Sequence, residues 1–210
     1  MEQFRRGLRA LRYAWWAIRS FVVLSWYRLS YAGISVGRGV RLGRGVYISV
    51  VRGGTLDLGN HVHIDSYSYL TVVGALTIGP RSYIGVGCTL VAQDRITVGQ
   101  DALIAAYVTL RDQDHEMDRS DAPYREQGLV ASPISIGQNV WIGTKATVLR
   151  GCSIGDNCVV GANAVVTKDI EGGRVAVGVP ARVVRKFATG PTSNAGNRGN
   201  EIARNKAPDS

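Results

Sequence analysis

A six-residue repeat of aliphatic positions runs through most of the chain and is clearest over residues 134–166. There an aliphatic residue falls at every sixth position, and Gly follows four of the six. The same spacing begins at Val36 and continues to Leu110, with small breaks that each add two or four residues. A fixed self-similar period of this kind indicates a solenoid. The clearest positions are Ile136, Ile142, Val148, Ile154, Val160 and Val166.

The geometry of a short strand explains the period of six. A strand alternates its faces, so one aliphatic side chain in each six points inward while its neighbours point outward. Gly or Asn directly after it can take the left-handed backbone of a sharp corner. Three strand-and-corner units close a triangle of about eighteen residues, and successive triangles stack about 4.8 Å apart. The repeat therefore predicts a mainly β fold, a parallel β-helix of roughly six triangular coils over residues 34–180.

The repeat fails badly once, between residues 111 and 133. This stretch is polar and acidic and contains Pro123 and Pro133. An insertion of this size in a solenoid must project from one corner. Loops carried on a rigid scaffold are where function concentrates. We therefore expect the projecting loop 111–133 to carry chemistry.

Residues 1–33 form the first predicted unit, with a basic amphipathic helix over residues 4–29. Its apolar side chains step by four and three, so they share one stripe. Arg19 and Arg28 interrupt the apolar run, which is too short to span a bilayer. A basic helix rich in Trp and Tyr suits the headgroup region of an anionic membrane. The alternative is a stripe that packs against the domain or a neighbouring subunit. The stripe consists of Phe4, Leu8, Leu11, Trp15, Ile18 and Val22.

The C-terminal end is predicted to leave the repeat. Residues 181–187 are basic and apolar and predict a short C-terminal helix, and residues 188–210 are polar enough to predict a disordered tail. The N-terminal apolar stretch lacks a cleavage site, so no signal peptide is evident. We expect a cytoplasmic protein, with the inner face of the membrane as its suggested location.

Charge and cysteine content narrow the function classes. The formal net charge of +9 implies attraction to anions. The basic residues are scattered and lack the aromatic interleaving of a stacking surface, so nucleic-acid binding is not expected. Each of the three cysteines lies in or beside a repeat, which predicts reduced, small core residues. They are Cys88, Cys152 and Cys158.

Five motifs carry a resemblance to a known family. They are DQDHEMD (112–118), REQG (125–128), PISIGQNVWIG (133–143), VVGANAVVTKDI (159–170) and VGVPARVVRK (177–186). With them the sequence resembles the hexapeptide-repeat acyltransferases, in the maltose/galactoside acetyltransferase-like and exopolysaccharide O-acetyltransferase branch. The resemblance implies a left-handed parallel β-helix, a homotrimer, acetyl-CoA as donor and an active site between adjacent subunits. The implied reaction is O-acetylation of a sugar hydroxyl in bacterial polysaccharide biosynthesis.

His115 is the candidate catalytic base. Histidine can take a proton near neutral pH without a large pKa shift, and here it would accept the proton of the acceptor hydroxyl. Such a base needs a partner that fixes its tautomer. Glu126, which resembles the family's acidic residue, is the first candidate and Asp118 the second; Asp112 and Asp114 are further ones.

The resemblance assigns the donor site to residues after the loop. Trp141 precedes an inward Ile, so its ring points outward, and the family places it beside the catalytic pocket. Pantetheine would contact the backbone of the coil, and the phosphates would meet residues near the C-terminal end. The implied CoA-binding residues are Trp141, Gly143, Thr144, Ala162, Thr167, Lys168, Arg182 and Arg185.

The acceptor is predicted less specifically. Candidate substrate-binding residues are Asp94, Asp112 and Trp141. Related sugar acetyltransferases commonly carry Asn where this chain has the stretch 87–89, Gly-Cys-Thr. This departure leaves open an O-acetyltransferase for a small non-sugar hydroxyl, such as serine or an antibiotic.

A non-catalytic or metal-binding hexapeptide scaffold is the remaining alternative. His61 and His63 are two residues apart, and such residues share a face on a strand. The third histidine lies far away in the loop, and neither CxxC nor HExxH occurs. We therefore expect no metal.

Overall fold

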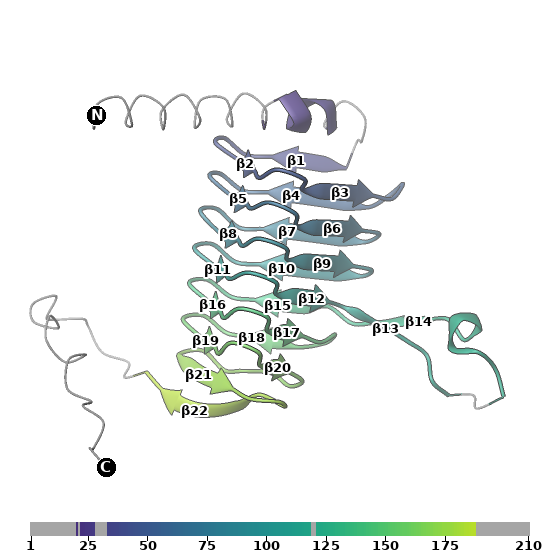
Figure 1. Cartoon of the computed structure of the whole chain (residues 1–210), viewed down its shortest axis with the longest axis vertical. Coiled ribbons are helices and arrows are strands. Elements are labelled where there is room, and N and C mark those ends of the chain that lie inside the picture. The colour runs from purple at the N-terminus through teal and green to yellow at the C-terminus, as the bar shows by residue number, and fades with distance from the viewer. Residues whose placement is uncertain (1–19, 21, 28–32, 119–120, 188–210) are drawn as a thin grey trace, which may run out of the picture.

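The computed structural model describes residues 20, 22–27, 33–118 and 121–187. Most of them form a β-helix with three faces, and each face is a sheet of mainly parallel strands (Figure 1). Face A holds β1 (Ile34–Val36), β4 (Thr55–Leu58), β7 (Ala75–Ile78), β10 (Arg95–Val98), β15 (Ile134–Ile136) and β18 (Ser153–Ile154). Face B holds β2 (Arg41–Leu42), β5 (His63–Ile64), β8 (Tyr83–Ile84), β11 (Leu103–Ile104), β16 (Trp141–Ile142), β19 (Val159–Val160), β21 (Arg174–Val177) and β22 (Arg182–Lys186). Face C holds β3 (Tyr47–Val50), β6 (Tyr69–Val72), β9 (Thr89–Ala92), β12 (Thr109–Arg111), β17 (Thr147–Val148) and β20 (Val165–Val166).

Parallel register stacks the repeat on itself. On face A, Leu58, Ile78, Val98, Ile136 and Ile154 occupy one column, because each is the register partner of the next. All five are almost fully buried. The six complete coils and the start of a seventh agree with the sequence prediction, and the hexapeptide repeats are consistent with a left-handed β-helix.

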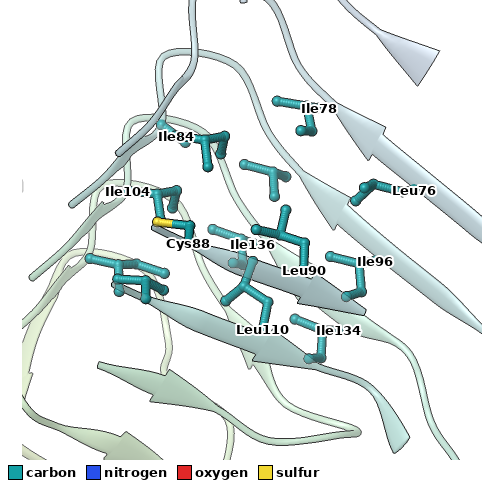
Figure 2. Close-up of a cluster of buried hydrophobic side chains, with 14 of the residues drawn as sticks. Leu76, Ile78, Ile84, Cys88, Leu90, Ile96, Ile104, Leu110, Ile134 and Ile136 are labelled. Atoms are coloured by element: carbon teal, nitrogen blue, oxygen red, sulfur yellow. The ribbon is translucent and has the colours of Figure 1, made fainter. Parts of the chain in front are cut away.

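The interior of the helix is filled by aliphatic side chains from all three faces (Figure 2). Cys88, Cys152 and Cys158 are buried among them as free thiols, as predicted. Burial raises the pKa of the Cys88 thiol to about 11, so this thiol stays protonated near neutral pH. These cysteines therefore act as small core residues.

The corners differ from the prediction in one respect. The Gly directly after each aliphatic position is not the left-handed residue; that residue lies two positions later, as at Asn139 and Lys145. The Gly is needed for another reason. A Cβ on Gly143 would lie 2.6 Å from the backbone nitrogen of Ala162 in the next coil. Close stacking of successive corners therefore selects the glycine.

The break in the repeat is an antiparallel ribbon that projects from the stack (Figure 1). It consists of β13 (Gln113–His115) and β14 (Leu129–Ala131), with the short 3₁₀ helix η1 (Tyr124–Glu126) between them. The ribbon leaves the corner where face C passes into face A, after β12. It carries His115 at the end of its first strand.

The predicted C-terminal helix over residues 181–187 is wrong. Arg182–Lys186 is the strand β22, which pairs antiparallel with β21. The chain reverses through residues 178–181, where Gly178 has a φ of +97°. The adjacent β-branched residues Val183 and Val184 suit a strand, and the open edge of β21 supplies backbone partners that a helix would leave unpaired. The predicted tail 188–210 lies outside the described residues.

A helical segment lies across the first coil (Figure 1). Of the predicted helix over residues 4–29, the structure describes residues 20 and 22–27. Leu24 is only 5% exposed, the Leu42 N–H donates to the Ser20 hydroxyl at 3.0 Å, and the Tyr27 hydroxyl donates to the Ile48 carbonyl at 3.1 Å. This segment therefore caps the open end of the core.

Over the described residues 22–27, the face that packs on the coil does not include the predicted apolar stripe. Val22, the one described member of that stripe, is 59% exposed, and so is Trp26 one turn later. Val22 thus faces away from the protein, and the other residues of the predicted stripe lie outside the described residues. Within the described part of the chain, no helix is long and apolar enough to cross a membrane.

Candidate functional site

Asp112 fixes the root of the ribbon. Its side chain is fully buried, and its two carboxylate oxygens accept three backbone N–H groups of the neighbouring corner. The donors are Gln93 at 2.7 Å, Asp94 at 2.9 Å and Arg95 at 2.8 Å. The predicted substrate contact of Asp112 does not fit this geometry, because the carboxylate is enclosed by the backbone that it ties together. Asp94 is exposed beside the same root, so its assignment to substrate stays a prediction.

His115 is exposed at the end of β13, opposite Leu129 of β14. Beside it, the Asp114 carboxylate accepts a hydrogen bond from the Arg150 guanidinium at 2.8 Å, which ties the ribbon to the C–A corner of the next coil. Asp114 is therefore occupied by an ion pair rather than by the imidazole. The ribbon thus presents a histidine to solvent from a root that is fixed at two points.

The two favoured orienting acids are both exposed. Glu126 lies 3.4 Å from the Arg125 guanidinium. Within the described ranges, no hydrogen bond joins His115 to Glu126 or Asp118. Their roles stay predictions.

Trp141 lies on the outer side of face B and is 51% exposed, as its position before an inward Ile indicated. The adjacent corner, between faces B and C, carries Thr144 in one coil and Ala162 in the next, both exposed. Gly143 is different. Its N–H already donates to the Val160 carbonyl at 2.8 Å, so this N–H is used by the coil and is not available to a ligand.

A pocket of about 340 Å³ at the C-terminal end brings two predicted donor-site cations together. Lys168 and Arg182 both line it, although Lys168 lies in the bend after β20 and Arg182 begins β22. The only carboxylate in its lining, Asp169, accepts the Ser153 N–H at 2.7 Å. The full lining is Lys168, Asp169, Ile170, Ala176, Ala181, Arg182 and Val183. Such a lining suits an anionic group.

Two further residues that were predicted for the donor site do not line this pocket. Thr167 is exposed and directly precedes Lys168, but it does not line the pocket. Arg185 does not line it either; its guanidinium lies 5.5 Å from the centroid of the Phe187 ring. The structure therefore supports Lys168 and Arg182 as a pair and leaves Arg185 apart from them.

The two histidines of the metal alternative do not share a face. His61 is a corner residue with a φ of 59°, whereas His63 lies on β5. Among the described residues, no group of three or more His, Cys, Asp or Glu side chains could hold a metal ion.

Two family models match the chain. The model described as bacterial transferase hexapeptide (six repeats) matches residues 133–168, and the hexapeptide repeat of succinyl-transferase matches residues 28–49. Among curated proteins, a probable acetyltransferase of Mycobacterium tuberculosis is 35% identical over 173 residues, which are 81% of this chain and 57% of that protein. Galactoside O-acetyltransferase of Escherichia coli is 37% identical over 131 residues, 62% of this chain and 63% of that protein. The chain thus spans less than two thirds of the length of these relatives.

Solved structures show the same fold. A galactoside acetyltransferase in complex with coenzyme A is 33% identical, with a TM-score of 0.52 and coverage of 73% of this chain and 65% of that one. AntD, an N-acyltransferase from Bacillus cereus in complex with dTDP and 3-hydroxybutyryl-CoA, has a TM-score of 0.66 and covers 77% of this chain and 88% of its own. At 23% identity, the likeness to AntD shows the fold alone.

The stacked coils and the two family models show a hexapeptide-repeat β-helix, and the relatives that it resembles are named acetyltransferases. The chain is similar to hexapeptide-repeat acetyltransferases, galactoside O-acetyltransferase among them.

Proposed function

We propose that the chain is an acetyl-CoA-dependent O-acetyltransferase that acts on a sugar hydroxyl in bacterial polysaccharide biosynthesis. The observation that carries the proposal is the pocket in which Lys168 and Arg182 meet. Two cations from separate parts of the chain in one pocket suit the phosphates of CoA. The names of the relatives support the acetyl group and the sugar acceptor.

Acetyl-CoA would supply the thioester carbonyl that the acceptor hydroxyl attacks. In this proposal His115 accepts the proton of that hydroxyl and later returns it to the departing thiol. Because the ribbon projects from its own stack, we further propose a homotrimer in which His115 serves the face B of a neighbouring subunit (Figure 1). Trp141 would then form one wall of the catalytic pocket between the two chains.

Charge reversal at the pocket tests the donor site. The double substitution Lys168→Glu and Arg182→Glu is expected to raise the CoA dissociation constant at least about tenfold, because charge-assisted contacts to phosphate are lost. Isothermal titration calorimetry measures the change. The matched control reverses two exposed arginines at the opposite end of the stack, Arg38→Glu and Arg52→Glu, and has the same effect on net charge. Equal CoA affinities for both double variants would refute the assignment of this pocket to CoA.

An acceptor panel of sugars, serine and aminoglycosides would distinguish the sugar proposal from a small non-sugar acceptor.

We also propose that the protein is cytoplasmic and meets the inner face of the membrane through its N-terminal end. The support is the outward position of Val22 and Trp26 on a segment whose other side packs on the first coil. Trp26→Glu is expected to reduce binding to phosphatidylglycerol vesicles at least about tenfold, because burial of one aromatic ring contributes about 1.5–3 kcal/mol. Vesicle co-sedimentation measures it, with Tyr124→Glu on the ribbon as the control. If Trp26→Glu binds as the unmodified chain does, the membrane contact is wrong.

A further inference from the structure

A hydrogen-bonded polar cluster on face B takes no part in the site described so far. The Tyr83 hydroxyl donates to Asp65 Oδ2 at 2.8 Å, and the Ser66 N–H donates to Asp65 Oδ1 at 2.6 Å. The ring of His63 meets the ring of Tyr83 edge-on, with 5.2 Å between centroids. His63, Asp65 and Tyr83 are all half-buried. We call these three residues the Asp65 cluster.

The Asp65 cluster lies in line with the proposed donor site. On face B, register partners run from His63 through Tyr83 and Leu103 to Trp141. Tyr83 is therefore two coils from Trp141, or about 10 Å at a coil spacing of about 4.8 Å. The pocket of Lys168 and Arg182 lies beyond Trp141 in the other direction. The cluster is thus on the far side of Trp141 from the proposed phosphate site.

Along the B–C corner, small residues lie between the Asp65 cluster and the proposed donor site. Asp65 has the same corner position as Gly143, with Gly85 and Ala105 between them, because the N–H of each donates to the next coil in the same way. The distance from Asp65 to Gly143 is then three coils, about 14 Å. Between them, this corner position carries no side chain at the buried Gly85 and only a methyl group at the half-buried Ala105. Asp65 is the carboxylate that ends this strip.

The protonation states suit the recognition of neutral hydroxyls. Burial acts to raise the pKa of Asp65, but hydrogen bonds from Ser66 and Tyr83 and the nearby His63 outweigh it and lower the pKa. Burial and the Asp65 carboxylate raise the pKa of Tyr83 to about 12. Burial and Arg41 lower the pKa of His63, and Asp65 opposes this only in part. At neutral pH the cluster therefore offers an ionised carboxylate, a phenol and a neutral imidazole.

The carboxylate has capacity for a ligand. Its two oxygens offer about four lone-pair sites; they accept from the Ser66 N–H and the Tyr83 hydroxyl, and the Ser66 side chain also hydrogen-bonds to the carboxylate, so a site remains for a ligand. A hydroxyl group can donate to such a carboxylate, whereas a second carboxylate or a phosphate would be repelled by it. Charge-assisted hydrogen bonds of this kind are the stronger ones.

We propose that the Asp65 cluster binds hydroxyl groups of a neutral acceptor sugar and so sets where that sugar lies relative to the thioester. This rests on the proposed O-acetyltransferase function and names its acceptor subsite. Asp65 accepts from the sugar, and Tyr83 holds the carboxylate in place. The sugar extends along Gly85 and Ala105 towards Trp141.

The test uses the full chain saturated with CoA and a panel of methyl glycosides of galactose, glucose, mannose and rhamnose. Glycoside binding is measured by saturation-transfer NMR titration, and CoA binding by calorimetry. Asp65→Asn is expected to raise the glycoside dissociation constant at least about tenfold, because it removes one charge-assisted acceptor. The CoA dissociation constant should change less than about twofold, since the cluster lies coils away from the phosphate pocket. Tyr83→Phe should act in the same direction and guards against a folding defect in Asp65→Asn.

The matched control is Asp57→Asn, which removes an exposed carboxylate from face A of the same coil. It should leave the affinities for glycoside and CoA unchanged. Glycoside affinity retained in both Asp65→Asn and Tyr83→Phe would overturn the proposal, as would a chain that binds CoA but none of the glycosides. Failure to bind CoA at all would instead refute the donor site, so the two proposals fail separately.

Discussion

Replacement of His115 by Ala is expected to lower kcat by roughly 10²- to 10⁴-fold, the usual contribution of a general base. His115 is the only histidine on the described part of the ribbon, and its strand is fixed at the root by Asp112 and Arg150. The loss is measured as the rate of acetyl transfer to the best acceptor of the glycoside panel, and release of the CoA thiol reports this rate. The affinity for CoA should stay the same, because the phosphate pocket lies coils away at the C-terminal end.

His61→Asn is the matched control for this prediction. It also removes an exposed histidine, and Asn tolerates the left-handed backbone at that corner. Its kcat should equal that of the unmodified chain. Activity of His115→Ala within about threefold of the unmodified chain would be far below the effect of a general base and would remove His115 from the mechanism.

The second large effect is expected at Asp112. An Asn at this position keeps the shape but presents an NH₂ group to at least one of three backbone donors. Hydrogen bonds to a charged acceptor contribute about 1.5–3 kcal/mol each, so Asp112→Asn should lower the free energy of unfolding by about 2–3 kcal/mol. Urea denaturation measures this loss. Activity should fall as well, because the ribbon root positions His115.

Asp114→Asn supplies the comparison. Its ion pair with Arg150 is partly exposed to solvent, and such pairs contribute at most about 1 kcal/mol. The two substitutions remove the same charge two residues apart, so they differ mainly in burial. Equal losses of stability would show that Asp112 does not anchor the ribbon.

The period of six was sufficient to predict the coils because inward packing and corner chemistry both repeat with it. The same pattern could not predict the role of each glycine, since Gly143 is selected by the approach of Ala162 from another coil. It also could not predict β22. A short basic and apolar segment suits a helix or a strand, and the open edge of β21 decided between them.

The candidate site was predicted in part for a similar reason. His115, Lys168 and Arg182 belong to motifs that are read locally. The burial of Asp112 depends on the corner at residues 93–95, which comes earlier in the chain. Asp65 and Tyr83 meet only because their coils stack in register, so neither residue stands out in the sequence.

The two ends of the stack are closed by different devices. A stack of parallel coils offers unpaired backbone groups at each end, and such edges invite further strands. The helical segment with Leu24 covers the first coil, while the last strand, β22, reverses direction and carries Arg182, Arg185 and Lys186. A coil of a second molecule would meet a helical segment at one end of the stack and an antiparallel, positively charged strand at the other. The solenoid is thereby protected from growing end to end into a fibre.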